Sequence, residues 1–221
     1  MRWLGLTMLM LAGAAPAAAA SPSTAARVEA QAVVHLGEGV TVRVPPSATY
    51  VGGERFTLYD VADCEIHVFI EADADRRTKR LWWIQFESYL PSRPELAYDY
   101  AEGNRRMMLG GTPTWVRANP VPTDGPMREG SDREAVFRIL KSGGYPIPPQ
   151  VMNVRMVQLL DDSKGTGQGR RELMIIYSEN LALSGKSLAD LTTDGKPDDR
   201  WTAMGEALIG RAMASVAVER R

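Results

Sequence analysis

Two carboxylates and an imidazole, set in two apolar segments, are the residues of this sequence best suited to acid–base chemistry. Glu65 and His67 lie in the segment CEIHVFI, and Glu87 lies in LWWIQFESY. Because strand side chains alternate between the two faces of a sheet, Glu65 and His67 share one face of the first segment. Two carboxylates shielded together would leave one of them with a raised pKa, which general acid–base catalysis requires. We therefore treat Glu65, His67 and Glu87 as candidate catalytic residues.

Pairing of the two segments would bring these groups together. The charged segment EADADRRTKR joins them, and alignment of their apolar faces sets Ile66 opposite Phe86. The other face then carries three cross-strand pairs: Glu65 with Glu87, His67 with Gln85, and Phe69 with Trp83. Like charges directly opposite each other are unfavourable, so the glutamate pair would need a proton, a cation or a ligand.

The same face is also a candidate binding surface, because aromatic side chains border its polar groups. Its ligand-binding candidates are Phe69, Trp83, Gln85 and Tyr89. The plain alternative is a solvent-exposed sheet face whose charges are met by arginines on neighbouring strands, such as Arg43, Arg55 or Arg155. That alternative is favoured over the catalytic interpretation.

Other local patterns in the sequence are too weak to predict a cofactor or a metal. The glycines of residues 165–169 lie between two predicted strands and not before a helix, and residues 184–187 lack the first glycine of a phosphate-binding loop. Asp73 and Asp75 have the spacing of calcium ligands, but arginines follow them. Two histidines and one cysteine are too few for a structural zinc site. We expect no cofactor and no metal.

The N-terminus has the three parts of an export signal. Arg2 precedes an apolar run that is too short to span a bilayer, and residues 18–20 form a small-residue cleavage site. The predicted organisation is a signal peptide at residues 1–20, a flexible leader at residues 21–35 and a single domain at residues 36–221. The protein is expected to be exported, periplasmic or secreted, with no transmembrane segment after signal removal. The Ala- and Arg-rich composition is typical of a bacterial protein.

The charge balance narrows the choice of partners. The chain has 26 basic and 27 acidic residues, and removal of Arg2 with the signal would leave a net charge of about −2. Without a basic cluster, nucleic acid is not an expected partner. A small molecule or another envelope protein remains as the expected partner. Cys64 is the only cysteine and lies on the apolar side of its segment, so we expect a buried, unreactive thiol.

The remaining elements predict an α+β fold. Ser131 and Glu134 form a capping box before a helix that stops at the glycines of residues 143 and 144. Asp198 or Asp199 caps a second helix expected to run through Val218. The segments VMNVRMVQLL and ELMIIYS are apolar on both faces, which is typical of central strands. We therefore predict one domain, mainly an antiparallel sheet with two main helices packed on it.

Two classes of function remain open from the sequence. The first is a non-enzymatic cell-envelope domain that binds a ligand or partner through the aromatic-rich sheet face. The second is an exported hydrolase or isomerase that uses Glu65, His67 and Glu87. A concave pocket holding all three side chains would favour the enzyme, whereas aromatics without converging titratable groups would favour the binding protein.

Overall fold

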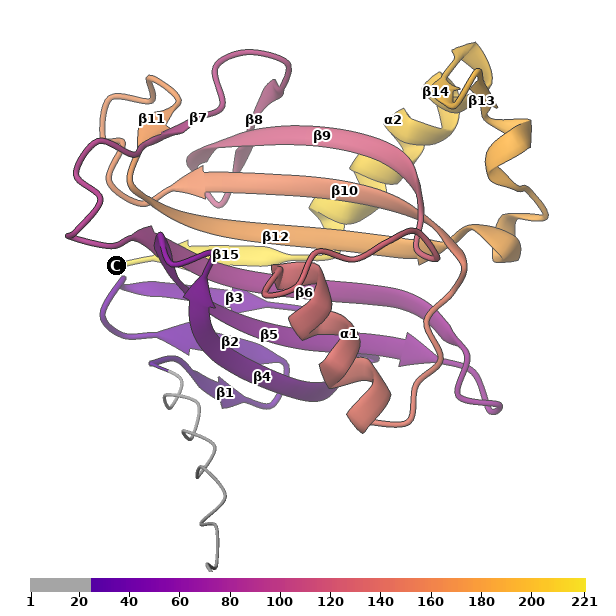
Figure 1. Ribbon diagram of the computed structural model, residues 1–221, viewed down its shortest axis with the longest axis horizontal. Coiled ribbons are helices and arrows are strands. Elements are labelled where there is room, and N and C mark those ends of the chain that lie inside the picture. Colours follow the sequence, from indigo (N-terminus) through magenta and orange to yellow (C-terminus); the bar gives the residue numbers. More distant parts are fainter. Residues whose placement is uncertain (1–24) are drawn as a thin grey trace, which may run out of the picture.

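The computed structural model describes residues 25–221 and contains two antiparallel sheets stacked face to face (Figure 1). The expected signal peptide at residues 1–20 lies outside the described residues. The larger sheet has seven strands in the order β4-β5-β6-β12-β10-β9-β8, and the smaller has four in the order β1-β2-β3-β15. Two short ribbons, β7-β11 and β13-β14, complete the strands.

The strands of the large sheet, in spatial order, are β4 (Thr49–Leu58), β5 (Ala62–Ala72), β6 (Thr78–Tyr89), β12 (Arg171–Asn180), β10 (Gln150–Leu159), β9 (Thr112–Pro122) and β8 (Arg105–Leu109). The small sheet contains β1 (Arg27–Glu29), β2 (Ala32–His35), β3 (Val40–Arg43) and β15 (Ala217–Arg220). The ribbons are β7 (Tyr98–Asp99) with β11 (Gln168–Gly169), and β13 (Thr192–Thr193) with β14 (Lys196–Pro197). The helices are α1 (Asp132–Ser142) and α2 (Asp199–Ala214), with single 3₁₀ turns at Leu181–Ser184 and Leu188–Asp190.

The predicted α+β class is wrong, because the second layer of the molecule is a sheet rather than a pair of helices. Three of its four strands, β1, β2 and β15, come from segments that were predicted as leader or as helix. The expected leader contains β1 and β2, and α2 ends at Ala214, so the segment up to Val218 that was predicted as helix includes part of β15. These strands have only three or four residues each, too few for an alternating pattern to stand out in an alanine-rich segment.

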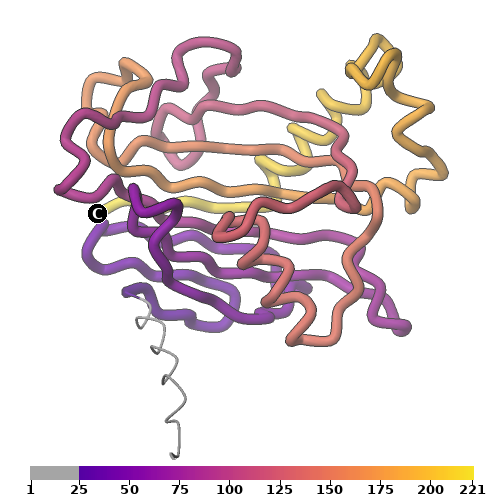
Figure 2. Tube along the Cα trace, viewed as in Figure 1, coloured from indigo at the N-terminus to yellow at the C-terminus, as the bar shows by residue number. Residues whose placement is uncertain are grey.

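The two sheets bury a common core that holds the two ends of the described chain together. Val33, Val42 and Val218 of the small sheet pack toward Phe69 and Ile84 of the large one. Because β15 pairs with β3, the C-terminal strand lies beside strands from the start of the chain, as the trace in Figure 2 shows. Burial of these branched side chains, worth about 1.5–3 kcal/mol each, explains why such short strands are held in place.

Helix α2 extends this inner core beyond the small sheet. Trp201, Leu208 and Ala212 are buried on one side of the helix and belong to the same cluster. Asp198 is the N-cap residue, and its side chain accepts a hydrogen bond from the backbone N–H of Arg200, which confirms one of the two predicted caps. No helix among residues 25–221 is long and apolar enough to cross a membrane.

The outer face of the large sheet is partly covered by α1. Its N-cap is Ser131, whose hydroxyl accepts a hydrogen bond from the backbone N–H of Glu134 at 3.1 Å, while the Glu134 carboxylate accepts from Gly130 instead of Ser131. The buried side of the helix packs over β4 and β5. Figure 1 shows the helix lying across that half of the sheet, so β12 and β10 extend beyond its cover.

The hairpin of β5 and β6 forms as predicted, but its register is shifted by one residue. Ile66 lies opposite Gln85 instead of Phe86, and Glu65 lies opposite Phe86. The loop is short, because Asp73 accepts hydrogen bonds from the backbone N–H groups of Asp75 and Arg77, and a bulge follows Glu71. Since both faces of this sheet are buried, the apolar pattern alone does not select one register.

Candidate functional site

The shifted register separates the predicted catalytic residues. Glu65 and His67 point into the space between the two sheets, whereas Glu87 lies opposite Cys64 and points to the outer face. The expected pairing of Glu65 with Glu87 is therefore wrong. His67 and Glu65 do meet, because the imidazole Nε2 lies 2.8 Å from a carboxylate oxygen of Glu65.

Glu65 anchors the start of the described chain. Its carboxylate accepts hydrogen bonds from the backbone N–H groups of Ala25 and Ala26 at 2.6 and 2.8 Å, and Tyr50 lies 3.2 Å from Nδ1 of His67. Burial raises the pKa of Glu65, but the hydrogen bonds from His67 and the two amides outweigh it and hold the pKa below its usual value. The carboxylate of Glu65, the ring of His67, the hydroxyl of Tyr50 and the two amides therefore each have a hydrogen-bond partner. We call this structural arrangement the Glu65 clamp.

A shallow cavity of about 170 Å³ lies beside this clamp. Glu65 and Glu87 both line it, together with Arg55 and Asp63, which form an ion pair with each other. His67 is not among its lining residues, and the Glu87 carboxylate is held on the outer face by Tyr98 and Gln85. The three candidate groups therefore do not converge on one cavity.

The four predicted ligand-binding residues are also divided between the faces. Phe69 lies in the core between the sheets. Trp83 and Gln85 lie on the outer face, joined by a hydrogen bond of 2.8 Å from the indole N–H to the amide oxygen. Tyr89 stacks on Tyr98 with 4.4 Å between the ring centroids, near the end of β6. Among these four residues, Trp83 lines a pocket on the outer face, between α1 and the large sheet.

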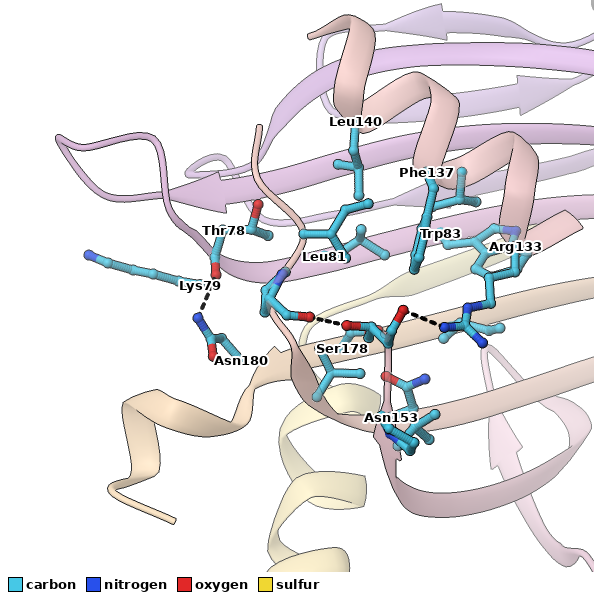
Figure 3. Close-up of a pocket in the computed structure, with 18 residues that line it drawn as sticks. Thr78, Lys79, Leu81, Trp83, Arg133, Phe137, Leu140, Asn153, Ser178 and Asn180 are labelled. Atoms are coloured by element: carbon cyan, nitrogen blue, oxygen red, sulfur yellow. Dashed lines mark hydrogen bonds between the residues drawn. The ribbon is translucent and has the colours of Figure 1, made fainter. Parts of the chain in front are cut away.

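That pocket lies where α1 stops covering the sheet. Its floor comes from four adjacent strands, its wall from α1 and its rim from the segment between α1 and β10. The apolar lining residues are Leu81, Trp83, Val121, Pro122, Val136, Phe137, Leu140, Ile147, Pro148, Val151 and Ile176 (Figure 3). The cavity measures about 110 Å³, the order of size of a cavity that accepts benzene.

One polar group in the floor of the pocket has no hydrogen-bond partner among the described residues. Asn153 lies between Asn119 and Ser178 in a cross-strand row on β9, β10 and β12. Its side-chain oxygen Oδ1 is buried and accepts no hydrogen bond there. An unpaired buried acceptor costs about 1–3 kcal/mol, so this oxygen lowers the stability of the fold at the floor of the pocket.

The charged groups of the pocket are both cationic. Arg133 and Asn153 lie on one side of the pocket, while Lys79 and Asn180 lie on the other (Figure 3). The Arg133 guanidinium donates to the carbonyl oxygen of Thr123 at 2.6 Å and lies 5.1 Å from the centroid of the Phe137 ring. Among the described residues, no carboxylate forms an ion pair with Arg133 or Lys79.

A buried acidic pair lies on the same face, behind Trp83. Glu87 on β6 is directly opposite Glu172 on β12, and only 9% and 2% of these residues are exposed. Tyr98 donates to Glu87 at 2.5 Å, and Tyr100 donates to Glu172 at 2.7 Å. Burial, followed by the charge of Glu87, raises the pKa of Glu172 to about 8, and burial also raises the pKa of Glu87. The pair therefore holds at least one proton at neutral pH.

Sequence reasoning did not find Glu172 or Asn153. Glu172 begins the segment ELMIIYS, and Asn153 stands in VMNVRMVQLL. A polar residue inside a segment that is apolar on both faces was the available signal, because burial of a polar side chain has to be compensated. This signal could not have identified the residues that surround Glu172 and Asn153, because those residues come from separate strands.

Comparison with known proteins gives no relative to this chain: no family model, curated protein or solved structure matches it. Across residues 25–221, no group of three or more His, Cys, Asp or Glu side chains is arranged to hold a metal ion. The function therefore has to be argued from the pocket itself.

Proposed function

We propose that this protein is an exported cell-envelope domain that binds a small, mainly apolar molecule without transforming it. Export is supported by the signal-like residues 1–20 of the sequence. Ligand binding is supported by the pocket between α1 and the large sheet, whose predominantly apolar lining also contains Lys79, Arg133 and Asn153. A concave apolar site with a few placed polar groups is the usual form of a small-molecule site.

A non-catalytic role is favoured by what lines this pocket. Its lining contains no Asp, Glu, His or Cys side chain, so the hydroxyl of Ser178 has no carboxylate or imidazole beside it in the pocket to activate it as a nucleophile. The acidic pair behind Trp83 is enclosed by phenols and an amide that already bond to it. The observation that carries the proposal is the apolar cavity of about 110 Å³ that Trp83 and Phe137 line.

The proposal is tested by titrating the protein with small neutral aromatics, acetophenone and benzamide, while following the indole N–H signal of Trp83 by NMR. Saturable shifts at Trp83 are expected, and Ile147→Trp should abolish them, because a larger side chain at the half-buried rim fills the mouth of the pocket. Leu36→Trp adds the same group at an exposed site, 61% exposed, and should leave binding unchanged. Absence of a saturable shift with either probe would overturn the proposal.

A further inference from the structure

The charge of the pocket between α1 and the large sheet is positive. Of the described residues that line it, Lys79 and Arg133 are cationic and none is acidic. A ligand ammonium group would therefore lie beside like charge in a partly desolvated site, and such contacts suppress binding strongly. The charge of the lining favours a neutral or an anionic ligand over a cationic one.

The two cations differ in where they place their charge. Figure 3 shows the Lys79 side chain extending away from the rest of the lining residues, and Lys79 is exposed. Arg133 is half-buried, and its guanidinium lies 5.1 Å from the centroid of the Phe137 ring, which also lines the pocket. Arg133 is therefore the cation that a ligand in the pocket would meet.

The Arg133 guanidinium is held in place and keeps donors for a ligand. Its Nη2 donates to the carbonyl oxygen of Thr123 at 2.6 Å, which uses one of its five N–H donors. The carboxylates on either side of it in the sequence bond to backbone instead, because Asp132 accepts from the N–H of Arg133 and Glu134 accepts from the N–H of Gly130. Neither carboxylate lines the pocket. A planar guanidinium with unused N–H groups matches the two oxygens of a carboxylate.

We propose that the pocket selects a ligand with one carboxylate attached to a small apolar body. The carboxylate accepts hydrogen bonds from the Arg133 guanidinium, and the apolar body packs against Trp83 and Phe137, which line the same cavity. Because the body displaces water from one side of the ion pair, it strengthens the attraction between the two charges. This inference rests on the proposed function and specifies the chemical class of its ligand.

Two probes of nearly the same shape test it: benzoate, which is anionic, and benzamide, which is neutral. NMR titrations that follow the Trp83 indole N–H should show benzoate binding about 10-fold more tightly than benzamide, as expected for hydrogen bonds to a charged partner. Added NaCl should weaken the binding of benzoate and leave that of benzamide unchanged, because salt screens the ion pair.

Removal of each cation in turn separates a direct contact from the effect of net charge. Arg133→Met keeps an unbranched apolar stem and removes the guanidinium, so the preference for benzoate should fall to about 2-fold or less. Unchanged binding of benzamide to this variant shows that its pocket is intact. Lys79→Met removes the same charge from the side chain that extends away from the pocket, and should preserve the preference. An equal loss in both variants would overturn the contact with Arg133.

The outcomes for the native protein distinguish the inference from the proposed function. Equal binding of the two probes, or tighter binding of benzamide, would overturn the carboxylate inference and leave the pocket proposal standing. Binding of acetophenone without binding of benzoate would have the same consequence. If none of the three probes binds, both the inference and the proposed function fail.

Discussion

Glu87 and Glu172 face each other across β6 and β12 with both carboxylates buried. Like charges in directly opposed positions repel, and burial strengthens the repulsion because little water screens it. Tyr98 and Tyr100 each donate a hydrogen bond to one member of the pair. The arrangement is stable only while a proton resides on the pair.

The stability of the protein should therefore fall as pH rises. The folded protein keeps a proton on Glu172 up to about pH 8, whereas the unfolded chain releases it near the ordinary value of 4.5. Between these values the folded state binds more protons, so each increase in pH favours unfolding. The pair should cost on the order of a few kcal/mol of unfolding free energy by pH 8. Denaturation midpoints across pH 4–9 would measure this loss.

Glu172→Gln should flatten that dependence, because an amide keeps the size of the side chain and carries no titrating proton. At pH 8 the variant should be more stable than the native protein, and at pH 4 the two should be similar. Glu206→Gln changes an exposed carboxylate on α2 and should leave the pH dependence as it is. An unchanged slope in Glu172→Gln would mean that the pair does not hold the proton.

Several elements could be predicted from the sequence because their signals are local. Ser131 placed the start of α1 and the glycine pair of residues 143 and 144 its end, and Asp198 placed the start of α2. The turn between β8 and β9 also has a local signal, because Gly110 and Gly111 both adopt positive φ there. The two segments that are apolar on both faces form β10 and β12, in the middle of the large sheet. A strand that is covered on both sides needs apolar residues on both of its faces.

The site could be predicted only in part, because its geometry depends on register and on distant segments. Trp83 was singled out, yet its neighbours in the pocket come from α1 and three other strands. Glu65 and Glu87 were paired on the assumption that one face of the hairpin is buried and the other is not. A second sheet made from short terminal strands buries the inner face as well, which removes the signal on which the register was based.

The N-cap of α1 should make a measurable contribution to stability. Ser131→Ala removes the hydroxyl that accepts from the Glu134 N–H and should cost about 1 kcal/mol in denaturant unfolding. Ser142→Ala removes an exposed hydroxyl at the other end of the same helix and should have little effect. Equal midpoints for Ser131→Ala and the native protein would show that the cap contributes nothing.

The Glu65 clamp should protect the start of the described chain from solvent exchange. Glu65→Ala removes the acceptor of the Ala25 and Ala26 amides, and hydrogen bonds to a charged group contribute about 1.5–3 kcal/mol. Amide exchange at Ala26 should therefore accelerate about 10- to 100-fold. Glu71→Ala removes a carboxylate from the same strand that pairs with Arg80, and should not change exchange at Ala26. Equal acceleration in both variants would indicate general loosening of β5.

The thiol of Cys64 should be unreactive in the native protein. The residue is fully buried on the outer side of β5, and burial followed by the nearby charge of Glu87 raises the pKa of the thiol. Since the thiolate is the reactive form, a thiol reagent should label the unfolded chain at once and the native protein only as fast as it opens. Rapid labelling of native protein would contradict this burial.

Cys64 also provides a direct test of the hairpin register. It lies opposite Glu87, whereas the register expected from the apolar pattern would set it opposite Ser88. Facing side chains of neighbouring strands have Cβ atoms about 4.5–5.5 Å apart, near the spacing of a disulfide, while the next residue along points to the other face. Glu87→Cys should therefore form a disulfide with Cys64 on oxidative refolding, detected as loss of both free thiols under denaturing conditions. Ser88→Cys should keep both thiols free, and cross-linking of Ser88→Cys in place of Glu87→Cys would reverse the assignment of the two faces.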